Sequence, residues 1–348
     1  MKLNPLTLKK LKRFCSIKRG YYSAIILVAL MLLSAFAELW VNNRAVIVKY
    51  ESNWYFPTYS KVLSGKTFGL DYNYETDYRT LNKQFEQETD SSNWVLMPII
   101  PFNAFENNYP DDEYPPFAPS FDSQHYLGTD IYGRDVAARL IYGFRLAMGF
   151  AFLVMTICYT IGVTIGCFMG YLGGKVDLFG QRIIEIWSQL PGIYVIMIIV
   201  SIFGSNFWLF VGIIVMFNWT AMTWYMRTLT YKERAREYVM AAKAQGASTA
   251  RIVFKHIMPN TLVMIVTMAP FTIVGNLTLL TSLDYLGLGL APPTPSWGEM
   301  LSQGKDNLDA IWIVSSVVTA IVVVLTMVTF VGEAVREAFD PKKHTKYI

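Results

Sequence analysis

The sequence predicts an all-α membrane protein with six transmembrane helices and an irregular extracytoplasmic insertion between the first and second. Hydrophobic residues make up 53% of the 348 residues and charged residues only 16%, against about 25% charged residues in soluble domains. The apolar residues gather in runs close to the roughly 20 residues that cross a bilayer as a helix. Charged segments separate these runs, a pattern typical of a protein that crosses the membrane several times.

Six apolar segments are long enough to cross the membrane. They lie at about 22–40, 143–171, 183–204, 207–226, 261–283 and 311–332. The third is the least clear, because Glu185 and Pro191 interrupt it, although a membrane helix tolerates proline when neighbours satisfy the freed carbonyl. The first follows a basic segment but is longer than a signal-peptide core and precedes no small-residue cleavage site. We therefore expect it to be retained as a helix.

Basic residues predict the orientation of the chain. Residues 1–21 hold seven Lys or Arg and no acid, and residues 227–260 hold seven against two acids. The C-terminal tail adds Arg336 and three lysines. Basic segments beside membrane helices stay in the cytoplasm. Six crossings place all three there, with both termini cytoplasmic and residues 41–138 outside.

This pattern predicts five parts in chain order. They are a cytoplasmic tail (1–21), the first transmembrane helix (22–40), a periplasmic insertion (41–138), a transmembrane domain of helices 2–6 (139–335) and a second cytoplasmic tail (336–348). The insertion is rich in Tyr, Asn, Pro and acids. Its prolines rule out one long regular element, so we expect a small, irregular folded domain.

The cytoplasmic segment 237–260 has the most informative pattern. Its alanines favour a helix and leave little side-chain bulk. Gly246 is expected to end that helix, Ser248 to cap a second, and Pro259 to stop the second. The segment therefore predicts two short helices around a turn, a compact knob that can seat in a groove of a soluble partner.

This segment resembles the coupling loop of binding-protein-dependent ABC importer permeases. The family pattern is Glu-Ala-Ala, three residues, Gly, nine residues, then Ile-x-Leu-Pro. Matching positions are Ala241, Ala242, Gly246 and Pro259, whereas Met240, His256 and Met258 replace the usual Glu, Ile and Leu. The Glu-Tyr-Val start and His-x-x-Pro-Asn end are the form of the dipeptide, oligopeptide and nickel branch. The resemblance implies that the ATPase-coupling residues include Glu237, Ala241, Ala242, Gly246, His256 and Pro259.

A second match precedes the second crossing. The run Leu127-Gly-Thr-Asp-Ile-Tyr-Gly-Arg-Asp135 resembles a signature of the same branch. Thr129 or Asp130 is expected to cap the following helix, and Asp135 and Arg139, four residues apart, to form an ion pair. We expect this segment to pack the entry to the helix rather than to contact substrate.

A third match, Leu286-Gly-Leu-Gly289 followed by Pro-Pro-Thr-Pro-Ser-Trp297-Gly298 after one intervening dipeptide, lies outside after the fifth crossing. Glycines there allow close backbone approach, and Trp297 suits the membrane interface. Asp284 stands just before it, where the family commonly has Ser. A carboxylate at the end of a crossing is either at the water boundary or a candidate residue of the substrate pathway.

The resemblance covers 125–341, including the ending Glu333 to Pro341. The long insertion, with Trp54-Tyr-Phe-Pro57, resembles that of the Yej-type permeases, which serve peptides and the peptide-nucleotide antibiotic microcin C. The implied fold is that of type I ABC importers, in the bacterial inner membrane. The implied partners are a second homologous permease subunit, two cytoplasmic ATPase domains that bind ATP and Mg, a periplasmic solute-binding protein and the lipid bilayer.

No catalytic, metal or cofactor site is predicted in the chain itself. The three histidines are scattered over different segments, and Ser64-Gly65-Lys66-Thr67 lacks the upstream glycine of a phosphate-binding loop. The small net charge of +4 argues against nucleic acid. The alternative function is an ion-gradient-driven secondary transporter or channel subunit. Such proteins usually carry ionisable residues in mid-membrane, and the apolar runs here are nearly free of them.

Overall fold

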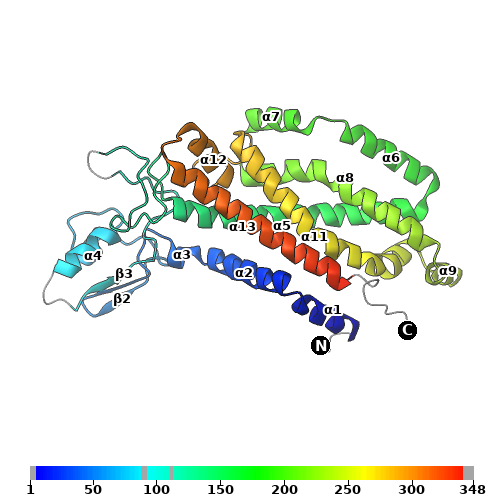
Figure 1. The fold of residues 1–348 in the computed structure, drawn as a ribbon, viewed down its shortest axis with the longest axis horizontal. Helices are drawn as coiled ribbons and strands as arrows, with labels where there is room; N and C mark the ends of the chain where they lie inside the picture. The colour runs from blue at the N-terminus through cyan, green and yellow to red at the C-terminus, as the bar shows by residue number, and fades with distance from the viewer. Residues whose placement is uncertain (1–4, 88–91, 110–112, 340–348) are drawn as a thin grey trace.

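A computed structural model of the chain describes residues 5–87, 92–109 and 113–339. The helices run side by side as a long bundle with a small domain at one end (Figure 1). In these residues five helices are long and apolar enough to cross a membrane: α2 (Lys18–Ala35), α5 (Val136–Leu172), α8 (Phe207–Arg234), the stretch Thr249–Tyr285 and α13 (Ile311–Phe339). Counted as one span, a bent pair of helices makes a sixth. The predicted all-α membrane fold is confirmed.

This bent pair consists of α6 (Gly174–Ser188) and α7 (Gly192–Phe203), which meet at 68°. The segment predicted as one crossing, 183–204, is therefore not one straight helix. Pro191 lies at the break, where its missing N–H and its ring prevent a continuous helix. The indole N–H of Trp187 donates to the Met216 carbonyl of α8, 2.8 Å away, and fixes the bend against the bundle.

Helix α5 lies at the centre of the bundle and packs most closely on α8. Three of its glycines, Gly162, Gly166 and Gly170, recur every fourth residue along this contact. A Cβ atom on Gly166 would lie only 2.5 Å from the Thr223 carbonyl oxygen, and one on Gly170 2.6 Å from that of Arg227. Small residues at this spacing let two membrane helices touch backbone to backbone.

The insertion folds as a small domain beyond α3 (Ala37–Trp40). Its strands β1 (Ile47–Tyr50), β2 (Asn53–Tyr55) and β3 (Trp94–Leu96) form an antiparallel sheet in the order β2-β1-β3, with α4 (Tyr78–Gln87) packed against it. Val48, Tyr78 and Leu81 form part of the core. Burial raises the pKa of Tyr78 to about 12. The Ser64–Thr67 stretch overlaps the short 3-10 helix η1 (Gly65–Phe68) of this domain.

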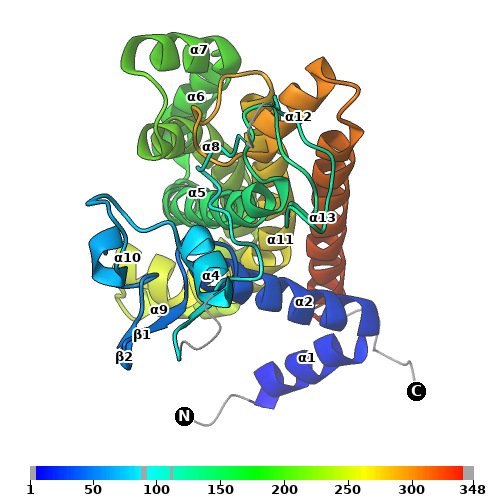
Figure 2. The same cartoon turned by 90° about the vertical axis from the view of Figure 1, so that its left-hand side faces the viewer.

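The opposite end of the bundle carries α1 (Pro5–Ser16), the end of α13 and the short helix α9 (Glu237–Ala244), as Figure 1 shows. Seen along the bundle, α6 and α7 lie at one side and α1 at the other (Figure 2). Residues 336–339, predicted as the start of a tail, continue α13 to Phe339. Residues 340–348, with Lys342, Lys343, His344 and Lys346, lie outside the described residues. We call the two ends of the bundle the insertion end and the α9 end.

Candidate functional site

Helix α9 presents two different faces at its end of the bundle. Val239 and Ala242 are buried, and they pack with Ile252 and Ile257 of the segment that follows. Glu237, Met240, Ala241 and Ala244 are exposed. Residues spaced by three, four and seven positions share one face of a helix. The two matching alanines therefore differ in role, because Ala242 holds the loop together whereas Ala241 is open to a partner.

The turn after α9 forms as the sequence predicts. Gly246 ends the helix with a φ of +78°, a left-handed conformation that favours glycine. The Ser248 hydroxyl then accepts a hydrogen bond from the Arg251 N–H and caps the next helix. A Cβ atom on Gly246 would meet nothing within 4 Å. The backbone conformation, rather than lack of space, therefore requires glycine here.

The expectation that Pro259 stops the second helix is wrong. The chain continues through α10 (Thr249–Arg251) and η2 (Ile252–Ile257) into α11 (Met258–Tyr285). The segment η2 is a π-helical turn, whose backbone hydrogen bonds span five residues instead of four. This wider hydrogen-bond spacing accommodates a proline ring with no N–H. The Asn260 side-chain amide donates to the carbonyl of the half-buried His256, 2.7 Å away. The loop is therefore continuous with a membrane-spanning helix.

A polar contact fixes α9 to α8. The Tyr238 hydroxyl donates to the Glu233 carboxylate over 2.7 Å. Burial, and then the hydrogen bond to Glu233, raise the pKa of Tyr238 to about 12. The phenol therefore stays protonated and keeps donating at neutral pH. This bond links α9 to α8, and the continuous chain links α9 to α11.

The insertion end holds a buried cluster of charged side chains. Its members are His125, Asp130, Arg134, Asp135, Arg139 and Glu299. Arg134 lies 2.7 Å from Asp130 and 2.8 Å from Glu299. Arg139 pairs with the same two carboxylates. Burial opposes the charge on Arg134, but the two carboxylates outweigh it and raise its pKa.

Two predictions for this motif are wrong. Asp135 does not pair with Arg139; it caps α5 by accepting the Ala138 N–H and also bonds His125, 2.8 Å away. The cap is therefore neither Thr129, whose hydroxyl accepts the Phe117 N–H, nor Asp130, which holds Arg134. Four-residue spacing allowed the predicted pair, but a cap carboxylate points back over the helix end.

Arg139 ties three segments together at the insertion end. It is fully buried and donates to the carbonyls of Ala104 in the insertion and of Pro293 and Thr294 before α12 (Trp297–Asp306). Buried charges persist only when paired and hydrogen-bonded. Since the cluster is internal and its charges are paired, its role is to hold the insertion, α5 and α12 in place.

Asp284 also lies inside the protein. Its carboxylate accepts the Leu290 N–H at 2.7 Å and the Ser296 hydroxyl at 2.5 Å. A Cβ atom on Gly289 would lie 1.8 Å from one carboxylate oxygen, so only glycine allows this approach. The carboxylate thus closes the loop after α11. Trp297, expected at the membrane interface, is buried, and its N–H donates to the Leu140 carbonyl.

Polar side chains that the sequence analysis did not single out line two cavities inside the bundle. A cavity of about 100 Å³ between α5, α8 and α11 is lined by Tyr159, Asn218, Thr272 and Asn276, among others. Asn218 also lines a cavity of about 340 Å³ at the bend between α6 and α7. These polar residues are scattered through apolar runs, so only the packing of helices brings them together.

Metal ligands are not clustered in the described ranges, where no group of three or more His, Cys, Asp or Glu could hold an ion. Free cysteines in the described residues are Cys15, Cys158 and Cys167.

Comparison with known proteins places this arrangement in a family. Residues 162–345 match the model of the binding-protein-dependent transport system inner membrane component. The inner membrane ABC transporter permease protein YejE of Escherichia coli (strain K12) is 39% identical over 98% of this chain and 99% of its own length. The peptidoglycan transport system permease protein YejE of Agrobacterium fabrum is 34% identical, over 98% and 94%.

Another relative aligns with a smaller share of this chain. The oligopeptide transport system permease protein OppC of Lactococcus lactis subsp. cremoris is 33% identical over 72% of this chain and 88% of its own. The predicted resemblance to peptide-branch permeases, and to the Yej type within them, is confirmed. The chain belongs to the family of binding-protein-dependent transport system inner membrane components, as a multi-pass permease of the ABC importers.

Proposed function

We propose that this permease moves peptides, including peptide conjugates of the microcin C kind, into the bacterial cytoplasm. Separate ATPase subunits bind ATP and Mg, hydrolyse the ATP and drive alternating access. The observation that carries the proposal is the exposed face of Glu237, Met240, Ala241 and Ala244 on a helix fixed to two membrane spans. The relatives include permeases of dipeptide, oligopeptide and peptidoglycan transport systems, which favours a peptide-containing substrate.

The basic segments support an orientation with the α9 end in the cytoplasm. Helix α1, the end of α13 and α9 share that end (Figure 1). All three belong to segments rich in Lys and Arg, which stay on the cytoplasmic side. Both termini are then cytoplasmic, and the insertion faces the periplasm.

The α9 face suits a groove on an ATPase because it is small and mostly apolar. Ala241 and Ala244 let a partner approach the backbone closely, and Met240, which is 54% exposed, offers a flexible apolar contact. Met240 takes the place of the family's usual Glu, so packing rather than an ion pair holds the partner here. Closure of two ATPase domains then displaces α8 and α11 together.

The cavities at Asn218 support a pathway along the bent crossing. Non-helical backbone at membrane depth occurs where it lines a cavity, and the break at Pro191 borders one of about 340 Å³. Amide and hydroxyl side chains pair well with the backbone of a peptide. A second homologous permease subunit would close the other side, and a periplasmic solute-binding protein would deliver the peptide at the insertion end.

Replacing Ala241 with Trp tests the docking face. In the complete transporter reconstituted into liposomes, we expect Ala241→Trp to lower ATPase association and peptide uptake by about tenfold or more, a loss of about 1.4 kcal/mol. Ala235→Trp is the matched control, because Ala235 is an exposed alanine outside this face. Normal docking and uptake in Ala241→Trp would refute the assignment. Proton-driven uptake by the chain without ATPases would favour a secondary transporter.

A further inference from the structure

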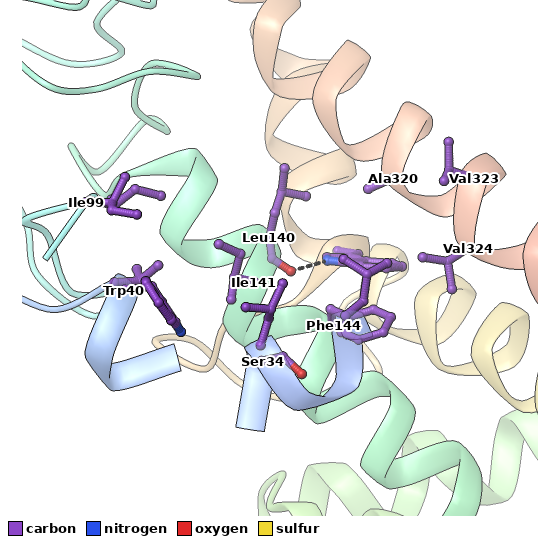
Figure 3. Close-up of a pocket in the computed structure, with 14 residues that line it drawn as sticks. Ser34, Trp40, Ile99, Leu140, Ile141, Phe144, Ala320, Val323 and Val324 are labelled. Carbon is purple, nitrogen blue, oxygen red and sulfur yellow. Dashed lines mark hydrogen bonds between the residues drawn. The ribbon is translucent and has the colours of Figure 1, made fainter. Parts of the chain in front are cut away.

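An apolar cavity of about 520 Å³ lies between α2, α5 and α13 near the insertion end. Figure 3 shows Leu140, Ile141 and Phe144 of α5 around this space, together with Ser34 of α2 and Val324 of α13. Its volume is within the range of about 300–1,000 Å³ of small-molecule pockets. The cavity is separate from the polar cavities around Asn218 and from the α9 face.

The cavity exists because two helices meet at one end and separate at the other. At the α9 end, α2 touches α13 so closely that a Cβ on Gly20 would lie 2.2 Å from the Cβ of Ala334. Toward the insertion end the two helices diverge (Figure 1). The Trp297 ring lines part of the space that this opens.

The chemistry of the walls excludes a polar ligand. Almost all of the lining is aliphatic or aromatic carbon. The Ser34 hydroxyl donates to the Met31 carbonyl, 3.0 Å away, and the Trp297 N–H to the Leu140 carbonyl, 3.1 Å away. Buried water needs two to four polar partners, which these walls do not offer.

The surroundings identify the occupant. The walls formed by α2, α5 and α13 belong to membrane spans, whereas residues of the insertion, Ile99 and Ile100 among them, close one end of the cavity. The mouth between α2 and α13 therefore faces lipid hydrocarbon. Leu33 (50% exposed) and Val323 (47%) flank the cavity and are open to that medium. The side chains that line an empty apolar cavity lack dispersion contacts on one side. A flexible acyl chain can supply these contacts. A helix of a partner protein, about 10–12 Å across with its side chains, is a worse match to a tapering space between two converging helices.

We propose that one acyl chain of an outer-leaflet phospholipid occupies this cavity and packs between α2 and α13. The leaflet rests on the orientation in the proposed function. Trp40, 42% exposed on the lining, stands at the insertion end, where its indole suits the level of the lipid ester groups. The chain keeps the outer part of α2 against the bundle, where direct helix contact is missing.

Photolabelling tests this site directly. The complete transporter is placed in nanodiscs with phosphatidylethanolamine that carries a diazirine in its acyl chain, and labelled peptides are mapped by mass spectrometry. Two variants fill the cavity, Ala320→Phe and Leu33→Trp, because both residues line it. Val322→Phe is the matched control, since Val322 is on α13, 56% exposed and not on the lining.

We expect labels on α2, α5 and α13 at the cavity, reduced about tenfold in either filling variant, equivalent to about 1.4 kcal/mol, and unchanged in Val322→Phe. Equal labelling of the cavity and of the exposed face around Val322 would overturn the proposal. Absence of cavity labels, with crosslinks from these residues to a second permease subunit, would overturn it as well. Labelling requires no transport, so failure of Ala241→Trp to impair docking would leave this result unaffected.

Discussion

Replacing Arg139 with Met tests whether the buried charge cluster holds the insertion end together. Met keeps much of the side-chain length and removes the charge. The variant deprives the carbonyls of Ala104, Pro293 and Thr294 of a donor. It also leaves Glu299 and Asp130 to share a single Arg134.

The magnitude follows from these contacts. Breaking a buried ion pair by removing one partner costs about 3–5 kcal/mol. Arg134 remains 2.7 Å from Asp130 and 2.8 Å from Glu299. Because both carboxylates keep this partner, we expect a stability loss at the lower end of that range. At about 2–4 °C per kcal/mol for a large domain, a loss of about 3 kcal/mol lowers the melting temperature by about 6–12 °C.

Thermal unfolding in detergent, followed by tryptophan fluorescence, measures this effect. Arg182→Met is the matched control, since the Arg182 side chain is 68% exposed and pairs with Glu185 at the surface. Exposed pairs contribute about 0–1 kcal/mol. The double variant Arg139→Met with Glu299→Gln removes one excess negative charge. We therefore expect it to lose less stability than the two single variants add up to.

Two results would refute the reasoning. One is a melting temperature for Arg139→Met no lower than that of Arg182→Met. The other is strict additivity in the double variant, which would mean that Arg139 and Glu299 do not interact.

Three further predictions concern separate parts of the chain. Gly246→Val forces a branched residue to a φ of +78°, at a cost of about 1–2 kcal/mol. ATPase docking should therefore fall in Gly246→Val, whereas Gly246→Asn should dock normally. Equal docking of the two variants would contradict this prediction. Asp284→Ala leaves the Leu290 N–H and Ser296 hydroxyl unpaired, so melting temperature and uptake should fall together, with Asp284→Asn less affected. Lost uptake with unchanged melting would instead place Asp284 in the substrate pathway. Burial opposes ionisation of Asp77, but the Thr80 hydroxyl and Arg79 outweigh it and lower its pKa below 3.8. The carboxylate therefore stabilises α4 above pH 3.8 and loses this effect as the pH falls below that value. The hydrogen-exchange protection of α4, taken relative to the intrinsic exchange rate at each pH, should fall at low pH in the native chain and not in Asp77→Asn.

The apolar runs predicted the membrane fold because a helix that faces lipid must be apolar along its whole length. The turn at Gly246 and the cap at Ser248 were also predictable, since each depends on the local backbone and on a side chain within three residues. The failure at Pro259 has a local cause too. A proline need not end a helix when a π-helical turn accommodates it, and the sequence does not show where such a turn forms.

The partners of the buried charged side chains could not be predicted from the local sequence. Arg139 and Glu299 are 160 residues apart, and only the packing of α12 against α5 brings them together. The glycines at positions 162, 166 and 170 carried a readable signal, the recurrence of small residues every fourth position that marks close helix contact. That spacing could have identified the seam between α5 and α8.

The sequence by itself determined the membrane class, the family and the position of the loop that we propose for ATPase docking. These depend on composition and on short motifs, which keep their meaning without a fold. The tertiary structure decided which alanine of the loop is exposed, which carboxylate pairs with which arginine, and where α2 and α13 leave an apolar cavity. Those features are distances between segments far apart in the chain, and they arise only when the helices pack.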